Sequence, residues 1–281
     1  MTEAVTRRLA SHALSLVGVG RRFGAVVALN NVSLEVGAGE RRAIIGANGA
    51  GKTTLFNTVT GDFPPTTGRV LFFGEDITRL PPHTRSRLGI GRTFQTCRLF
   101  PFLSVRDNLL LGCHAAMHTG VWSDGLHLPR SSRAQREAMH EVDELLELLS
   151  LEEVADRLAT ELPLGMQRLT EIGRALATRP KLLLLDEATS GVSRSETKEL
   201  VEVLRRCRRT HGLSLLVVEH DVALVLSLCS WIYVLDFGRV LTSGRPAEVR
   251  SDPAVIEAYL GRSDSEAAVP APEEVRLAAR S

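Results

Sequence analysis

The stretch "RRAIIGANGAGKTTLFNTVTG", residues 41–61, decides the fold. An apolar run leads into the glycine-rich loop "GANGAGKT" at 46–53, and a helical pattern follows as far as Gly61, which suits the residue after a helix end. The loop satisfies G-x-x-x-x-G-K-[ST] and lies between a strand and a helix, as phosphate binding requires. Glycines let successive backbone N–H groups curl around phosphate oxygens, and the helix N-terminus adds partial positive charge. An ordinary glycine-rich turn would not need these flanks, so the sequence predicts a nucleotide site.

Two side chains of this loop have specific expected roles. Lys52 is expected to reach the β and γ phosphates, and the Thr53 hydroxyl to bind Mg²⁺. The predicted phosphate-binding residues are Gly46, Ala47, Asn48, Gly49, Ala50, Gly51, Lys52, Thr53 and Thr54.

A second motif, "LLLLDE", ends in Asp186 and Glu187. A buried strand that releases two carboxylates at its C-terminal end places them where ligands bind in an open α/β sheet. Asp186 suits the magnesium ion, directly or through water, and Glu187 suits polarising the attacking water. The alternative is a strand-end aspartate that caps the next helix, and the neighbouring phosphate loop disfavours it.

Strand patterns alternate with helical ones along most of the chain, which predicts a mostly parallel sheet wound on both faces. The runs 14–19 and 28–36 read as a strand pair, and 68–77 as a further strand and turn. After residue 180 come strand "KLLLLDE", helix "SETKELVEVLRRCRRT", strand "LSLLVVEHD", helix "VALVLSLCS" and a final strand "WIYVLDFGRV".

Between these parts, "SVRDNLLLG" and "RAQREAMHEVDELLELLS" have helical spacing. One apolar face of the second helix is predicted to contain Met139, Val142, Leu145, Leu146 and Leu149. The block interrupts an α/β chain, so we expect an inserted helical subdomain at about 96–175 within a domain spanning 13–261. Residues 262–281 are rich in alanine, proline and acids and are predicted to form a disordered tail.

Composition excludes several other classes of protein. The formal net charge of the 281 residues is +1, which argues against a dedicated nucleic-acid binder. The four cysteines have neither CxxC nor zinc-like spacing, so we expect reduced, mostly buried thiols in a cytosolic protein. No apolar run reaches the ~18 residues of a membrane helix, and no signal-peptide core follows the N-terminus. The chain is expected to be soluble, although it could dock on a membrane protein.

Together these motifs, in this order, resemble the nucleotide-binding subunit of ATP-binding cassette (ABC) transporters. The resemblance implies a P-loop NTPase with an antiparallel β subdomain, which binds ATP and Mg²⁺. Phe23, in "RRFGAVVALNNV", matches the aromatic that stacks on adenine, although it could be an ordinary core phenylalanine. Gln95, in "RTFQ", matches the glutamine that links the magnesium site to the helical subdomain. His220, in "VVEHD", matches the histidine that contacts the γ-phosphate.

The segments "GRTFQTCRLFPFLSVRDNLLLG" and 217–261 look like a subfamily, the ATPase subunits that power uptake of branched-chain amino acids and related small polar solutes. Its systems pair two different ATPases on transmembrane permease subunits, fed by a periplasmic binding protein. The resemblance therefore implies a second ATPase subunit and a peripheral place on the cytoplasmic face of the cell membrane.

The stretch "LPLGMQR" aligns with the family's signature loop, which closes over the ATP held by the opposite subunit. Its residues are Leu162, Pro163, Leu164, Gly165, Met166 and Gln167, followed by Arg168 and "EIGRAL". Pro163 replaces the usual serine and so lacks a hydroxyl and a backbone N–H that could donate to the γ-phosphate. Losing a donor to a charged group costs ~1.5–3 kcal/mol, about tenfold to a hundredfold in closing or hydrolysis. Ser193 also departs from the usual aspartate or asparagine, and neutral drift in a tolerant loop remains the alternative.

The sequence leaves four further alternatives to be weighed. Leu99, Phe100 and Phe102 could form a docking face for a membrane subunit or belong to the subdomain core. The cargo could be urea, amides or a lipid, because the ATPase subunit does not touch it. An ATP-binding but hydrolytically weak subunit is a rival that Pro163 and Ser193 favour, and that Lys52 and Glu187 oppose. A soluble ABC-type ATPase for DNA or ribosomes is disfavoured by the absence of long coiled coils, a second cassette or a basic face.

Overall fold

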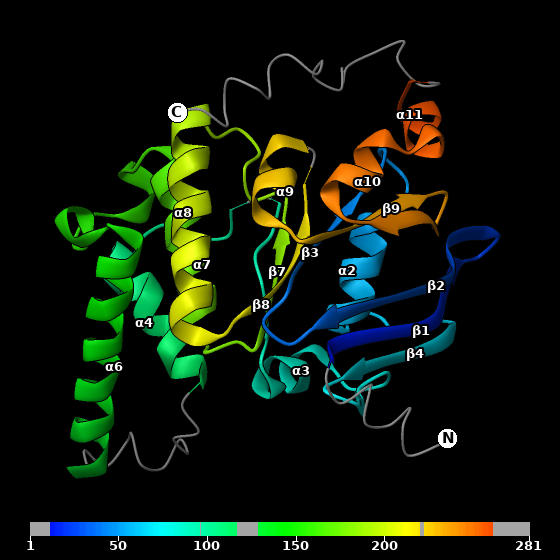
Figure 1. The fold of residues 1–281 in the computed structure, drawn as a ribbon. Coiled ribbons are helices and arrows are strands. Elements are labelled where there is room, and N and C mark those ends of the chain that lie inside the picture. Colours follow the sequence, from blue (N-terminus) through cyan, green and yellow to red (C-terminus); the bar gives the residue numbers. More distant parts are fainter. Residues whose placement is uncertain (1–11, 96, 117–128, 220–221, 261–281) are drawn as a thin grey trace.

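A computed structural model describes residues 12–95, 97–116, 129–219 and 222–260, and within them the chain forms two β-sheets and a block of helices (Figure 1). The first sheet has the strand order β2-β1-β4-β5, and neighbouring strands are antiparallel. Its strands are β1 (His12–Phe23), β2 (Val26–Gly37), β4 (Thr67–Phe72) and β5 (Glu75–Asp76). This is the expected antiparallel β subdomain.

The second sheet has the order β10-β9-β3-β8-β7-β6. All its neighbouring pairs are parallel except β9 with β10. Its strands are β3 (Arg41–Ile45), β6 (Ile90–Arg92), β7 (Leu182–Asp186), β8 (Ser214–Val218), β9 (Trp231–Asp236) and β10 (Arg239–Gly244). The helices outside the helical block are α2 (Lys52–Thr60), α3 (Pro82–Leu88), α8 (Arg194–His211), α9 (Val222–Leu228), α10 (Pro246–Ser251) and α11 (Pro253–Leu260).

The last predicted strand, 231–240, is two strands in the structure. Phe237 and Gly238 both have positive φ, 41° and 72°, and they turn β9 back antiparallel as β10, with Asp236 opposite Arg239. Two left-handed residues are the geometry of a tight hairpin loop. The sequence prediction missed this turn because only one of its two residues is glycine.

The inserted block contains α4 (Val105–Ala116), α6 (Pro129–Leu149) and α7 (Leu164–Ala177), which pack on one another, and two short 3₁₀ turns at Glu152–Val154 and Ala159–Glu161. The predicted apolar face of α6 is largely buried, since Val142, Leu145, Leu146 and Leu149 are in the core and Met139 is half-buried. In Figure 1 the block lies beside the strands, on the opposite side from α2 and the antiparallel sheet. Residues 262–281 lie outside the described part of the chain.

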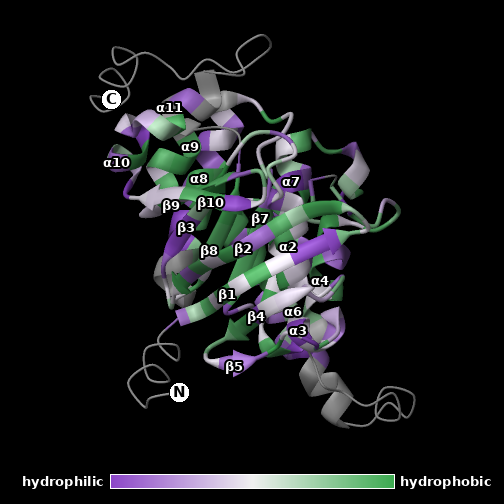
Figure 2. Ribbon diagram, turned by 90° about the vertical axis from the view of Figure 1, so that its right-hand side faces the viewer, coloured by the Kyte–Doolittle hydropathy of each residue, from purple (hydrophilic) through white to green (hydrophobic). Residues whose placement is uncertain are grey.

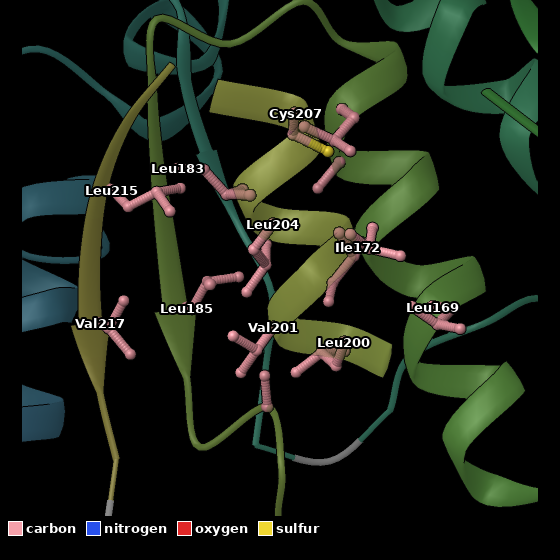
Figure 3. Close-up of a cluster of buried hydrophobic side chains, with 14 of the residues drawn as sticks. Leu169, Ile172, Leu183, Leu185, Leu200, Val201, Leu204, Cys207, Leu215 and Val217 are labelled. Carbon is pink, nitrogen blue, oxygen red and sulfur yellow. The ribbon is translucent and has the colours of Figure 1, made fainter. Parts of the chain in front are cut away.

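The parallel sheet has an apolar core on each face. Leu183, Leu185, Leu215 and Val217 face α8 and α7, as Figure 3 shows, whereas the alternate residues of β7 and β8 pack toward α2 and the antiparallel sheet. Burial on both faces explains why these strands read as continuous apolar runs rather than alternating ones. Figure 2 shows the same apolar strands enclosed between more polar elements.

The fold also fixes the helix that follows the phosphate loop. The fully buried Arg85 of α3 donates to the Thr58 and Val59 carbonyls in the last turn of α2, and to the Leu80 and Thr78 carbonyls. A cation beside the last carbonyls of a helix favours its dipole. Burial lowers the pKa of this guanidinium. Arg85 therefore anchors the end of α2 opposite to the phosphate loop.

Candidate functional site

The phosphate loop runs from the end of β3 into α2 and has a conformation that only glycine tolerates at several points. Gly49 and Gly51 have φ of 80° and 103°, in the left-handed region. A Cβ on Gly46 would lie 2.2 Å from the Leu235 carbonyl oxygen. The loop is therefore held by the neighbouring hairpin, with Asn48, Gly49 and Thr53 exposed.

Lys52 is the first residue of α2, and its side chain turns back into the loop. Its ammonium donates to the Gly46 and Ala47 carbonyls at 2.7 and 3.0 Å. Burial lowers the pKa of Lys52, while the charges of Glu187 and Asp186 act in the opposite direction. An ammonium has three donors, so one remains for an anion after these two bonds.

Asp186 ends β7 and is buried in an ion pair with Arg92. The Arg92 Nη2 lies 2.8 Å from the Asp186 Oδ2, and both side chains are at least nine-tenths buried. Arg92 ends β6, where its backbone pairs in parallel register with Leu184. A second amino group of Arg92 donates to the Asn57 side-chain oxygen of α2 at 2.6 Å. One arginine thus ties the aspartate to the helix of the phosphate loop.

Glu187 and Gln95 meet beside this pair. The Gln95 side-chain amide donates to the Glu187 carboxylate at 2.7 Å, although 92 positions separate the two residues. Glu187 has a φ of 48°, rare for a residue with a side chain, and its backbone N–H donates to the Val218 carbonyl of β8 at 2.8 Å. Such strain is typical of functional positions, where the surrounding structure holds the residue in place.

The three predicted metal ligands supply a donor set that fits magnesium. They are a threonine hydroxyl (Thr53), an amide oxygen (Gln95) and a carboxylate (Asp186), all hard oxygen donors. Arg92 uses one oxygen of Asp186, and Gln95 contacts Glu187 through its nitrogen, so each keeps an oxygen for a cation. The residues present therefore fit the ion that the motifs imply.

Phe23 is not a core residue: it lies at the end of β1 with 44% of its surface exposed. The Arg21 guanidinium lies over its ring at 4.6 Å and over the Phe63 ring at 4.5 Å, and the two rings meet edge to face. The exposed aromatic surface is thus available for stacking, and Arg21 flanks it.

The signature residues form the start of α7. Pro163 is the N-cap, one position before the first turn, and it supplies no side-chain hydrogen bond to the helix end. Leu164 and Met166 are exposed, whereas Leu162 is buried and accepts a hydrogen bond from the Gln167 side chain at 2.8 Å. The loop therefore presents Pro163, Leu164 and Met166 at the surface.

Gly165 is buried against Glu196 of α8. A Cβ on Gly165 would lie 2.4 Å from the Glu196 Oε1. Glu196 in turn forms a capping box with Ser193, whose hydroxyl and backbone N–H both donate to its carboxylate. Ser193, the second departure from the family pattern, therefore has a structural role as the N-cap of α8.

A groove separates α3 and β6 from the helical block. Its volume is about 450 Å³, and its lining includes Arg85, Arg92, Phe94, Phe100 and Arg174. Phe100 and Phe102 are 51% and 88% exposed, so these two are not subdomain core, while Leu99 is half-buried. The exposed pair favours the docking interpretation of this segment.

His220 lies outside the described residues. The sequence analysis also missed three contributors to the site: Arg92, Arg21 and Glu219. Glu219 is buried and accepts hydrogen bonds from the Thr189 N–H and hydroxyl at 3.0 and 2.9 Å. The sequence could have indicated Arg92 and Glu219. Arg92 ends a strand three residues before Gln95, and Glu219 follows a strand directly before His220.

Comparison with known proteins gives a consistent result. The family model described as "ABC transporter" matches residues 29–190, and one described as "Branched-chain amino acid ATP-binding cassette transporter" matches 239–265. The chain is 42% identical over 250 residues to the high-affinity branched-chain amino acid transport ATP-binding protein LivG of Escherichia coli K12, covering 89% of this chain and 98% of that protein. This chain belongs to the ATP-binding proteins of ABC transporters.

Other ABC proteins extend this relationship. BraF of Pseudomonas aeruginosa, also named a branched-chain amino acid transport ATP-binding protein, is 40% identical with 89% and 98% coverage. A nucleotide-free ATP-binding cassette from an ABC transporter superposes with a TM-score of 0.77 at 33% identity, covering 88% of this chain and 98% of that one. A cassette in its ADP conformation gives 0.76 at 32% identity, with 89% and 99% coverage. The protein is therefore a nucleotide-binding ABC ATPase with the P-loop NTPase fold, as the motifs predicted.

ABC ATPases work with permease subunits in the membrane. None of the helices among the described residues is long and apolar enough to cross a bilayer. The four cysteines are free and mostly buried, as expected: Cys113, Cys207 and Cys229 are buried, and Cys97 is half-buried.

Proposed function

We propose that this ABC ATPase hydrolyses Mg·ATP to power uptake of branched-chain amino acids or related small polar solutes. The observation that carries the hydrolytic part is the Gln95–Glu187 hydrogen bond beside the buried Lys52 and Asp186. The printed names of LivG and BraF support the cargo.

Each residue has a role that follows from its place. The backbone of residues 46–51 and the N-terminus of α2 receive the phosphates, and Lys52 neutralises the β and γ groups. Thr53, Asp186 and Gln95 would hold Mg²⁺, which when bound bridges phosphate oxygens and neutralises developing charge. Phe23 stacks on adenine, and the Arg21 guanidinium lies over the Phe23 ring.

Glu187 acts on the attacking water. Glu187 directly follows β7, and the Gln95 amide donates to one oxygen of its carboxylate, which orients this group. The proposed role of the carboxylate is to accept a proton from the attacking water. His220, from the resemblance, is the proposed contact to the γ-phosphate. The left-handed backbone of Glu187 is held by the hydrogen bond from its N–H to the Val218 carbonyl.

The proposed assembly has two ATPases, head to tail, on two permease subunits at the cytoplasmic face of the cell membrane, with a periplasmic solute-binding protein. The second ATPase is a different chain, or a second copy of this one. The groove beside Phe100 is the proposed contact for a permease helix, because Phe100 and Leu111 in its lining are exposed apolar residues. The proposed domain spans 13–261.

A second candidate is an ATP-binding subunit with weak hydrolysis in the opposite site. It is favoured by Pro163, because the N-terminus of α7 has no side-chain cap and lacks the hydroxyl that a serine would bring to the partner's ATP. The two candidates differ only in which of the two ATP sites of the paired ATPases hydrolyses its nucleotide.

The test is steady-state ATPase activity of the purified chain, wild type against Glu187→Gln. We expect the glutamine variant to lose at least about a hundredfold in kcat while it still binds ATP, because it keeps the shape and loses the base. Glu153→Gln, an exposed glutamate in a 3₁₀ turn, is the matched control. Unchanged turnover in Glu187→Gln would remove this residue from the mechanism.

The cargo is tested separately, in cells. Deleting the gene should abolish saturable uptake of labelled leucine, and the wild-type chain but not Glu187→Gln should restore it. Normal leucine uptake in the deletion strain, with loss of uptake of another small solute such as urea, would move the cargo assignment to that solute.

A further inference from the structure

Two buried charged residues of α7, Arg168 and Glu171, hold the backbone of the loop that carries Gln95. Arg168 Nη1 donates to the Phe94 carbonyl at 2.9 Å, and its Nη2 donates to the Gln95 carbonyl. Glu171 Oε1 accepts from the backbone N–H groups of Phe94 and Arg98 at 3.4 and 3.2 Å. The loop's peptide groups thus bind to side chains instead of to a neighbouring strand.

The two side chains also pair with each other. Arg168 Nη1 lies 3.2 Å from Glu171 Oε2, and the side chains are only 5% and 3% exposed. Burying two charges is costly unless their remaining donors and acceptors are satisfied. Here the loop backbone accepts from both Arg168 amino groups and donates to the Glu171 Oε1, although the buried Arg168 Nε has no partner. The pair and the loop therefore depend on each other.

This contact lies between two parts of the ATPase that act on different nucleotides. Arg168 is three residues after Gly165 of the signature loop. In the proposed assembly this loop closes over the ATP of the opposite subunit. The peptide it binds belongs to Gln95, whose side chain orients Glu187 at this chain's own ATP. In Figure 3 the Ile172 side chain of α7 lies next to α8, and both helices contribute to one apolar core that supports α7.

We propose that Arg168 and Glu171 are positioning residues for hydrolysis: they transmit the position of the signature helix to the Gln95 amide and so to the Glu187 carboxylate. The inference rests on the roles proposed above for Gln95 and Glu187. A displacement of α7 on closure over the partner's ATP moves the loop peptide as well, because four of its hydrogen bonds end on this helix. Small misplacements of a catalytic group cost up to about a hundredfold in rate.

The test uses variants that avoid leaving one buried charge unpaired. The pair Arg168→Met/Glu171→Met removes both charges with little change in volume, and buried ion pairs are commonly replaced in this way without loss of stability. Glu171→Gln and Arg168→Lys are milder variants, because each keeps part of the hydrogen bonding. Arg179→Met is the matched control: Arg179 follows α7 at its other end and pairs with Glu141 on the surface.

In the purified full-length chain we expect the double methionine variant to lose roughly tenfold to a hundredfold in kcat, with KM for ATP within about twofold. Arg168→Lys should recover part of kcat, and Arg179→Met should equal wild type. Adding Gln95→Ala to the double variant should lower kcat no further than Gln95→Ala alone, because both act through the same group.

Amide hydrogen exchange gives a readout that needs no turnover. The Phe94 and Arg98 amides should exchange at least about tenfold faster in the double methionine variant, while those of α2 and the dissociation constant for ATP stay unchanged. Wild-type kcat in a variant whose loop exchanges faster would overturn the positioning role. Unchanged exchange at Phe94 and Arg98 would overturn the contact itself. A wild-type chain that binds ATP but neither hydrolyses it nor depends on Glu187 would instead refute the proposed function.

Discussion

Arg92 and Asp186 form a buried ion pair across the carboxyl ends of two neighbouring strands, with Nη2 2.8 Å from Oδ2. The pair joins the strand before the helical block to the strand after it, and Arg92 also binds the Asn57 side chain of α2. The proposed magnesium ligand is therefore held by a residue that was not among the predicted site residues.

Removing this arginine should destabilise the fold. Arg92→Leu leaves the Asp186 carboxylate buried without a partner, and we expect the free energy of unfolding to fall by about 3–5 kcal/mol. Urea denaturation followed by circular dichroism measures this change. Arg92→Leu/Asp186→Asn should regain part of the loss, because the unpaired charge is gone.

The control for this prediction is Arg179→Leu, which removes an exposed pair with Glu141 and should cost less than about 1 kcal/mol. If Arg92→Leu were no less stable than Arg179→Leu, the buried pair would contribute nothing to the fold.

Restoring the signature serine should speed hydrolysis. In Pro163→Ser the hydroxyl stands at the N-terminus of α7, where it can cap the helix and donate to a phosphate in the closed dimer. We expect kcat of the purified chain to rise by about tenfold to a hundredfold, the reverse of the ~1.5–3 kcal/mol loss from a missing donor. Steady-state ATPase measurements decide this.

Pro253→Ser, at the first position of α11, is the matched control and should leave kcat unchanged. Equal turnover in Pro163→Ser and wild type would mean that the proline is neutral. In an assembly with a different partner ATPase, the rise in kcat should appear only when the partner's own ATP site can hydrolyse ATP.

The capping box at α8 should make stability depend on acid pH. Hydrogen bonds from the Ser193 hydroxyl, then from its backbone N–H, hold the pKa of Glu196 below the ordinary glutamate value of 4.5. The unfolded chain then binds more protons than the folded one between the two pKa values, so stability falls as pH drops below about 4.5. Glu196→Gln keeps the box geometry and should remove this contribution.

Urea unfolding of wild type and Glu196→Gln, compared from pH 7 down to pH 3.5, measures that contribution. We expect wild type to be the more stable at pH 7 and the difference to shrink below pH 4.5. Glu199→Gln, on an exposed position of the same helix, serves as control. A difference that stays constant across this range would contradict the assigned pKa direction.

The four thiols should be slow to alkylate in the folded protein. Burial is the first cause that raises the pKa of Cys97 and Cys207 to about 11 and of Cys113 and Cys229 to about 12; for Cys97 the Glu171 charge adds to it. At pH 8 a thiol with a pKa near 11 is about one part in a thousand thiolate, and the thiolate is the reactive form.

Mass spectrometry after iodoacetamide treatment tests this. Cys97, the half-buried one, should react first but at least about a hundredfold more slowly than free cysteine, and all four should react in urea. Modification of any of the four in native buffer at the rate of free cysteine would contradict the burial-based order.

The sequence by itself determined the parts of this protein that follow from local spacing. The phosphate loop between strand and helix, the carboxylates after an apolar strand and the amphipathic face of α6 each occupy a short window whose period or motif has one physical interpretation. The hairpin at Phe237 was missed because a left-handed conformation at a non-glycine residue has no local signature.

Only the tertiary structure decided which distant residues share the site. Arg92 meets Asp186 because β6 lies beside β7 in a particular register, and Gln95 meets Glu187 because Arg168 and Glu171 hold its loop. Gly165 has no room for a side chain because Glu196 of another helix fills that space. These contacts depend on how whole elements pack, and no period of a single segment encodes that packing.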